Sequence, residues 1–341
     1  MKNIFKEKNI LITGGAGSFG SAMLEHILEY EPHVVRVFDN NEESIFHLEQ
    51  KFGKYPNVRF LLGDLRDKDR LTRAIENIDT VIHAAALKHV HSCEYNPFEA
   101  VKTNIIGTQN LIDVAINEGV KEVMLTSTDK AANPTNVMGA SKLMGEKLIV
   151  AANYCQGGKG TLFSCVRFGN VVGSSGSVVP LFNKQIQKGG PVTITDPDMT
   201  RFIISLPQAL ELVMRSMELA HGGETFILKM NSFKVGVLAE AMINELSSKY
   251  GYKPEDIQIK EIGSKAGEKF HEDLMTEEEL TRSLETDDFF IILPQLKEAS
   301  EIDRFNYKNA KKTKSKNFSS KDARLLSKEE ISDLLRKESL I

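Results

Sequence analysis

The feature that most constrains the fold is a glycine-rich turn between a short apolar run and an amphipathic segment near the start of the chain. The run NILIT at 9–13 is typical of a strand buried in a parallel sheet, and SFGSAMLEHILEY at 18–30 has helical spacing. Between them, TGGAGSFG places Gly14, Gly17 and Gly20. Glycine allows the backbone to turn tightly and to approach a pyrophosphate, which the amides of the following helix can bind. This strand–turn–helix context predicts a dinucleotide site rather than a merely structural turn.

Strand-like and helical segments alternate from residue 9 to about residue 172. Strands are expected at 33–40, 58–65, 79–86, 121–128 and 162–171, and helices at 42–52, 68–77, 100–119 and from Ala140 to about Cys155. This alternation predicts an α/β fold with a doubly wound, parallel, Rossmann-like sheet.

Carboxylates at two strand ends indicate which dinucleotide is bound. Asp39 ends the second strand, 19 residues after Gly20, where a carboxylate accepts both ribose hydroxyls of NAD and repels a 2′-phosphate. The NNEES that follows contains no Arg or Lys, so NAD is favoured over NADP. Asp64 could bind the adenine amino group or could be an ordinary aspartate at the start of a loop. The expected cofactor-binding residues are Gly14, Gly17, Ser18, Phe19, Gly20, Asp39, Asp64, Leu65, Ala84, Ala85 and Lys142.

The alternating pattern becomes less regular after Val172 and suggests two domains. A helix at 206–220 and a strand at 224–229 are expected to rejoin the sheet. The boundaries that we expect are an NAD-binding Rossmann domain at 1–175, with 200–235 returning to it, and a smaller C-terminal α/β substrate-binding domain and tail at 176–199 and 236–341.

The C-terminal region contains a lysine-rich run at 308–324, which we interpret as a solvated tail rather than a polyanion site. A last helix is expected to begin after Ser327, with Glu330 completing a capping box.

Five sequence blocks resemble a known family. They are AALKHV (85–90), STDKAANPTNVMGASK (127–142), RFGNVVGSSGSVVPLF (167–182), MTRFIIS (199–205) and GEKFHEDL (267–274). Residues 8–235 resemble the extended short-chain dehydrogenase/reductases. The five blocks are similar to the nucleotide-sugar 4,6-dehydratases of bacterial polysaccharide and glycan biosynthesis. One form of that family has Tyr four residues before the Lys that corresponds to Lys142, and another has Met, as Met138 is here.

The resemblance implies a division of catalytic roles. Asp129 would be the acid toward the leaving hydroxyl at carbon 6, and Lys130 the base at carbon 5. Thr128 would hydrogen-bond the 4-hydroxyl, and Lys142 would hold the nicotinamide ribose. Without the family, Asp129 and Lys130 could be a surface ion pair after a strand. Met138 has no proton to transfer, so the base at the 4-hydroxyl is either Asp129 acting twice or a water.

The resemblance also implies a set of substrate-binding residues. Asn170 would contact the diphosphate, and Arg201 would bind a phosphate or form a structural salt bridge. Lys88, Met138 and Glu268 complete the expected set, whereas Asn104 is expected to fix the backbone of the site.

These residues predict a lyase that dehydrates UDP-N-acetylglucosamine and inverts carbon 5. The alternatives are a 4-epimerase of the same sugar nucleotides and a cofactor-binding scaffold without turnover. The formal net charge of −4 argues against a nucleic-acid partner, and the three cysteines lack metal-ligand spacing. These cysteines look like reduced cytosolic thiols, so a cytoplasmic protein is expected. No apolar run reaches the roughly 20 residues of a membrane helix. A homo-oligomer is expected because it is common in this family.

Overall fold

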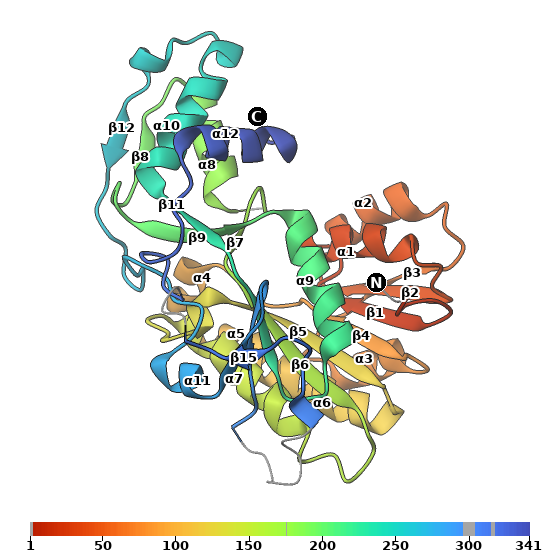
Figure 1. The fold of residues 1–341 in the computed structure, drawn as a ribbon. Helices are drawn as coiled ribbons and strands as arrows, with labels where there is room; N and C mark the ends of the chain where they lie inside the picture. The colour runs from red at the N-terminus through yellow and green to blue at the C-terminus, as the bar shows by residue number, and fades with distance from the viewer. Residues whose placement is uncertain (1–2, 175, 296–303, 315–317) are drawn as a thin grey trace.

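The computed structural model describes residues 3–174, 176–295, 304–314 and 318–341 (Figure 1). Within these residues, a ten-stranded sheet has the order β15-β13-β14-β10-β6-β5-β4-β1-β2-β3. Its strands are β1 (Asn9–Thr13), β2 (Val34–Asp39), β3 (Val58–Leu62), β4 (Thr80–His83), β5 (Glu122–Thr128), β6 (Leu162–Phe168), β10 (Thr225–Leu228), β13 (Ser283–Glu285), β14 (Phe289–Ile292) and β15 (Lys311–Lys312). The strands from β3 to β10 pair in parallel, which confirms the predicted doubly wound sheet. The strand order reverses direction between β1 and β4, and ligands of such sheets bind outside the strand ends at that point.

Helices cover both faces of the sheet because successive side chains of each buried strand point to opposite sides. Ile10 and Ile12 of β1 belong to a core that includes side chains of α1 (Ser18–Leu28), α2 (Glu42–Phe52) and α9 (Leu206–Leu219). Leu11 belongs to the core of the other face, with α3 (Lys68–Ile75), α6 (Gly107–Glu118) and α7 (Val137–Ala152).

Two helices differ from their predicted form. α7 begins at Val137 instead of Ala140, because the Asn136 side chain accepts a hydrogen bond from the Gly139 amide at 2.8 Å and caps the helix there. The helix expected at 100–119 consists of α5 (Pro97–Ala100), the π-helical η1 (Val101–Ile106) and α6, and follows the short α4 (Val90–Tyr95).

A smaller region stands beyond the strand ends. Figure 1 shows α8 (Val178–Gln187), α10 (Val235–Leu246) and α12 (Lys328–Lys337) together with β8 (Val192–Ile194) and β12 (Ile259–Glu261). A three-stranded sheet of β7 (Asn170–Val171), β9 (Thr200–Ile204) and β11 (Asn231–Lys234) lies between this region and the main sheet. The remaining short helices are η2 (Asp129–Ala131), η3 (Ser248–Tyr250), η4 (Pro254–Asp256) and α11 (Glu277–Thr281).

The sheet does not follow the predicted boundaries everywhere. β10 and α9 return to the main sheet as expected, whereas β9 belongs to the small sheet. The strands β13, β14 and β15 come from the segment assigned to the second domain but extend the main sheet, because β14 pairs antiparallel with β10. The division into domains itself stays a prediction.

The lysine-rich run at 308–324 was predicted to be a solvated tail, and residues 315–317 lie outside the described residues. The described lysines are exposed, as predicted, but the segment is not a free tail. β15 pairs with β13, and Ser319, Ser320 and Ala323 are buried. The Ser320 hydroxyl lies 2.7 Å from the Thr200 hydroxyl and accepts a hydrogen bond from the Glu272 amide at 2.9 Å, which fixes this segment against β9. The capping box of α12 is present as predicted. In the described part of the chain, each helix is too short or too polar to cross a membrane.

Candidate active site

A cavity of about 720 Å³ lies where the carboxyl ends of β1, β4, β5 and β6 meet the smaller region. Most of the predicted site residues line it: Gly14, Gly17, Ser18, Phe19, Gly20, Asp39, Asp64, Leu65, Ala84, Ala85, Lys88, Thr128, Lys130, Met138, Lys142 and Asn170. Three predicted residues, Asp129, Arg201 and Glu268, are not part of this lining. The structure thus brings together residues that are far apart in the sequence, whereas these three residues do not line the cavity.

The glycine loop has the geometry of a phosphate cradle. Gly14 has a φ of +66°, and a Cβ atom there would lie 2.6 Å from the Ala85 nitrogen. A Cβ atom at Gly20 would lie 2.4 Å from the Gly14 carbonyl oxygen. Gly17 caps α1 without a side-chain hydrogen bond, so the N-terminus of this helix faces the cavity without a covering side chain. These residues fit the pyrophosphate of a dinucleotide.

The two strand-end carboxylates have different surroundings. Asp39 accepts hydrogen bonds at 3.0 Å from the amides of Ala16 and Asn41, which fixes it between the glycine loop and the cavity rim. Asp64 is bound by the guanidinium of Arg66 at 2.7 and 2.9 Å, and these hydrogen bonds lower the pKa of Asp64 to about 2. Arg66 was not predicted as part of the site, although it is only two residues from Asp64 in the sequence.

The predicted acid and base form one cluster at the end of β5. Asp129 is fully buried, and its Oδ1 accepts hydrogen bonds from the Thr128 hydroxyl at 2.9 Å and from Lys130 Nζ at 3.0 Å. Lys130 also donates to Asn170 Oδ1 at 3.3 Å. Burial lowers the pKa of Lys130, but Asp129 and Glu272 outweigh it and raise that pKa overall. This cluster is therefore not a surface ion pair, and it presents an ammonium group to the cavity.

Glu272 is a further member of this cluster that sequence reasoning missed. Its Oε1 lies 3.6 Å from Lys130 Nζ and 4.0 Å from Arg201 Nε. The block GEKFHEDL contains Glu272, but the resemblance implies a role only for Glu268. Glu272 is recognisable only by its proximity to Lys130 in the folded structure, and the sequence does not show this proximity.

Lys142 and Met138 lie on the same helix beside the cavity. Lys142 Nζ donates to the Thr126 carbonyl at 2.7 Å, and burial lowers the pKa of this amine to about 8. Met138 is buried against Cys93 and Ala100 and also lines the cavity. Met138 thus presents an apolar side chain to the cavity four residues before Lys142.

Asn104 holds the backbone of the site, as predicted. Its amide accepts a hydrogen bond from Leu87 N at 2.8 Å and donates to Leu87 O and to Ser141 Oγ. This links the loop after β4 to α7. Nearby, His83 is buried between the hydroxyls of Thr13 and Thr108, and burial lowers its pKa to about 3, so it is neutral.

Arg201 and Glu268 do not reach the cavity. Arg201 donates to the carbonyls of Thr200 and Phe270 and faces Glu272, which matches its structural alternative. Glu268 is half-buried, and its backbone follows the turn that begins at Lys265. The positions of Arg201 and Glu268 do not support the predicted contacts of these residues with substrate.

The segment after α12 contributes to the cavity from the far end of the sequence. Glu338 and Leu340 line the wall, and a Cβ atom at Gly173 would lie 2.5 Å from the Leu340 side chain. Sequence reasoning missed both residues, since nothing local to them indicates such a position.

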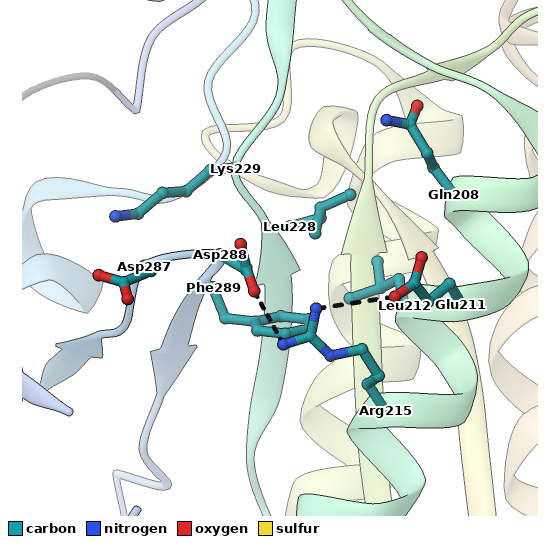
Figure 2. Close-up of a pocket in the computed structure, with 9 residues that line it drawn as sticks. All are labelled: Gln208, Glu211, Leu212, Arg215, Leu228, Lys229, Asp287, Asp288 and Phe289. Carbon is teal, nitrogen blue, oxygen red and sulfur yellow. Dashed lines mark hydrogen bonds and ion pairs between the residues drawn. The ribbon is translucent and has the colours of Figure 1, made fainter. Parts of the chain in front are cut away.

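A second, smaller pocket of about 350 Å³ lies between α9, the end of β10 and the start of β14 (Figure 2). Arg215 pairs there with Asp288 at 2.9 Å and with Glu211 at 3.9 Å, and it stacks on the Phe289 ring. None of the predicted site residues lines this pocket. Arg215 is held in these ion pairs, and Lys229 pairs with Glu285 at 2.7 Å, so the chemistry is assigned to the larger cavity.

Comparison with known proteins agrees with this assignment. The pattern of the family described as "Polysaccharide biosynthesis protein" matches residues 10–294. The chain belongs to this family. The predicted resemblance to the polysaccharide-biosynthesis dehydratases is thereby confirmed at the level of the family.

The relatives of this protein include a nucleotide-sugar dehydratase and a nucleotide-sugar epimerase. A protein of Methanocaldococcus jannaschii described as an uncharacterized membrane protein is 50% identical over 341 residues, covering 100% of this chain and 99% of the relative. A UDP-N-acetylglucosamine 4,6-dehydratase (inverting) of Campylobacter jejuni is 45% identical over 296 residues, covering 86% of this chain and 85% of the relative. A UDP-glucose 4-epimerase of Rickettsia conorii is 35% identical over 336 residues, covering 97% and 96%.

A solved structure has nearly the same fold. The structure of Pen from Bacillus thuringiensis has a TM-score of 0.92 and 47% sequence identity, and the match covers 99% of both chains. The similarity to this structure thus extends over the smaller region as well as over the main sheet.

Proposed function

We propose that the protein is an NAD-dependent 4,6-dehydratase of UDP-N-acetylglucosamine that acts in polysaccharide or glycan biosynthesis. The observation that carries this proposal is the Thr128–Asp129–Lys130 cluster around the buried Asp129 carboxylate, which opens to the cavity beside Lys142. The dehydratase relative at 45% identity supports the choice of substrate. Inversion at carbon 5, a cytoplasmic location and a homo-oligomer remain predictions.

The residues of the glycine loop would hold NAD, together with Asp39 and Lys142. Such a cofactor would supply hydride acceptance from carbon 4 of the sugar and hydride return to carbon 6. Oxidation at carbon 4 acidifies the hydrogen at carbon 5, so a base can remove it. Lys130 takes that proton, and Asp129 protonates the hydroxyl that leaves carbon 6.

The 4-hydroxyl still needs a base, because the thioether of Met138 cannot accept its proton usefully. The Thr128 hydroxyl donates to Asp129 Oδ1, so a 4-hydroxyl bound at Thr128 would lie next to that carboxylate. This geometry supports Asp129 over water as the group that acts twice. It would receive the proton from the 4-hydroxyl and later give it to the leaving hydroxyl.

A 4-epimerase is the second candidate, and the relative at 35% identity favours it. An epimerase needs no acid–base pair at carbons 5 and 6, so the buried Asp129–Lys130 pair would have no task. Incubation with UDP-N-acetylglucosamine, followed by mass spectrometry and NMR, separates the two candidates. A dehydratase gives a 4-keto-6-deoxy product that has lost one water, whereas an epimerase gives an isomer of the substrate.

The cofactor preference gives a direct prediction for Asp39. The purified protein should bind NAD(H) in preference to NADP(H), and Asp39→Arg should weaken NAD binding because it removes the ribose acceptor. Each lost charge-assisted hydrogen bond corresponds to about 1.5–3 kcal/mol, and isothermal titration calorimetry measures the change. A clear preference of the unaltered protein for NADP(H) would contradict this assignment.

A further inference from the structure

Glu272 is held rigidly behind the predicted base. Its side chain is 4% exposed and does not line the cavity, and its Oε1 lies 3.6 Å from Lys130 Nζ. Its backbone exchanges two hydrogen bonds with Ser320, whose segment is buried against β9. Among the described residues, Oε2 of this carboxylate is buried without a hydrogen-bond partner.

The charges around Glu272 allow it to bind a proton. Burial raises its pKa above the ordinary value, the neighbouring Asp129 acts in the same direction, and the positive charges of Lys130, Arg201 and Lys269 oppose both. A like charge beside a buried carboxylate favours its protonated form, so the charge of Asp129 favours a proton on Glu272. Asp129 Oδ2 is likewise buried without a partner among the described residues.

Lys130 needs such a neighbour if it is the base at carbon 5. An ammonium group cannot accept a proton, and the pKa of Lys130 is raised, so this side chain is charged at neutral pH. Its surplus proton must therefore move before the hydrogen at carbon 5 can be removed. The carboxylates of Asp129 and Glu272 are its ion-pair partners among the described residues, and Asp129 is already assigned to the two hydroxyls.

We propose that Glu272 is a positioning residue that takes the surplus proton of Lys130 and so leaves a neutral amine facing carbon 5. The inference rests on the proposed function, since it assumes that Lys130 is the base. In this step an N–H bond of Lys130 breaks, an O–H bond forms on Glu272, and both groups become neutral. The amine then takes the proton from carbon 5, and the C–H electron pair moves toward the carbonyl at carbon 4. No oxidation or reduction occurs in either transfer.

The test is the pH dependence of solvent exchange at carbon 5 in Glu272→Gln. Substrate is incubated in heavy water, deuterium at carbon 5 is measured by NMR, and reduction of the cofactor is followed by absorbance. We expect oxidation at carbon 4 to persist, whereas exchange falls by about 10²-fold at pH 7, the usual magnitude for a proton-transfer group. Exchange should recover as the pH rises, because bulk base then removes the surplus proton. Loss of the Glu272 charge, which raises the pKa of Lys130 in the wild type, makes that removal easier.

Two further variants separate this role from a structural one. Glu272→Asp keeps the carboxylate and should retain the wild-type pH profile at reduced amplitude. Glu278→Gln makes the same charge change on the same segment, where the side chain is exposed and pairs with Arg282, and should leave the profile unchanged. Should Glu272→Gln not fold, the profile of Glu272→Asp decides alone: a wild-type shape supports the proposal, and a shifted or flat profile overturns it.

Other results have distinct meanings. Unchanged exchange in Glu272→Gln would overturn the inference, as would an equal loss of oxidation and exchange that does not recover at high pH. The failure of the proposed function looks different: the unaltered enzyme would then form no dehydrated product, or Lys130→Ala would retain exchange at carbon 5.

Discussion

Replacing Lys130 by alanine should reduce turnover of UDP-N-acetylglucosamine by about 10²–10⁴-fold, the range typical of a general acid or base. The variant loses the amine that lies 3.0 Å from Asp129 and faces the cavity. It keeps the glycine loop, Asp39 and Lys142, so oxidation at carbon 4 should still give an absorbance signal from the reduced cofactor. Product formation measured by mass spectrometry should fall much further than this signal.

Met138→Ala is the contrasting variant. It changes a cavity-lining side chain on α7 that has no proton to exchange, so a measurable fraction of activity should remain. A loss as large as that of Lys130→Ala would show that position 138 has a chemical role that the proposal lacks.

Replacing Arg167 by methionine should destabilise the protein by about 3–5 kcal/mol, because it leaves two buried carboxylates without their cation. Arg167 is fully buried in β6 and binds Glu146 of α7 at 2.6 Å and Glu279 of α11 at 2.9 Å. It also donates to the Leu274 carbonyl at 2.7 Å, two residues from Glu272. Urea denaturation at 25 °C measures the loss.

The effect of this substitution should depend on pH. Burial would raise the pKa of Glu279, but the charge and hydrogen bonds of Arg167 and the backbone of Thr276 outweigh it and lower the pKa to about 2. This carboxylate therefore stabilises the wild type fully above its ordinary pKa of 4.5, and the contribution is lost as the pH falls toward 2. The difference between wild type and Arg167→Met should shrink accordingly on acidification.

Arg215→Met provides a matched control for Arg167. Its ion pair with Asp288 is about one-third exposed on the arginine side, so its loss should cost about 1 kcal/mol or less (Figure 2). Equal losses in the two variants would contradict the account of the buried network.

The parts of the fold that local patterns encode could be predicted. The turn with Gly14 and Gly20 has a steric requirement that appears directly in the sequence, and short apolar runs identify strands whatever their partners are. The Ser327–Glu330 capping box is likewise encoded within four residues. These features were enough to predict the parallel sheet and the edge at which the cavity lies.

The parts that depend on distant contacts could not be predicted. The strands β13 to β15 join the main sheet through pairing with β10, and no local pattern specifies that partner. Arg167 lies in an apolar strand, and one of its two carboxylate partners, Glu279, is 112 residues away in the sequence. Glu272, Glu338 and Leu340 reach the site only because the chain returns to it.

The fate of the hydrogens during turnover tests the dehydratase proposal most directly. UDP-N-acetylglucosamine deuterated at carbon 4 should give a 4-keto-6-deoxy product in which that deuterium is on carbon 6. With unlabelled substrate in heavy water, the product should carry one solvent deuterium at carbon 5, and Lys130→Ala should abolish this incorporation. NMR of the product locates each label. Return of the deuterium to carbon 4, with no solvent deuterium at carbon 5 and no loss of water, would contradict the proposal and identify an epimerase.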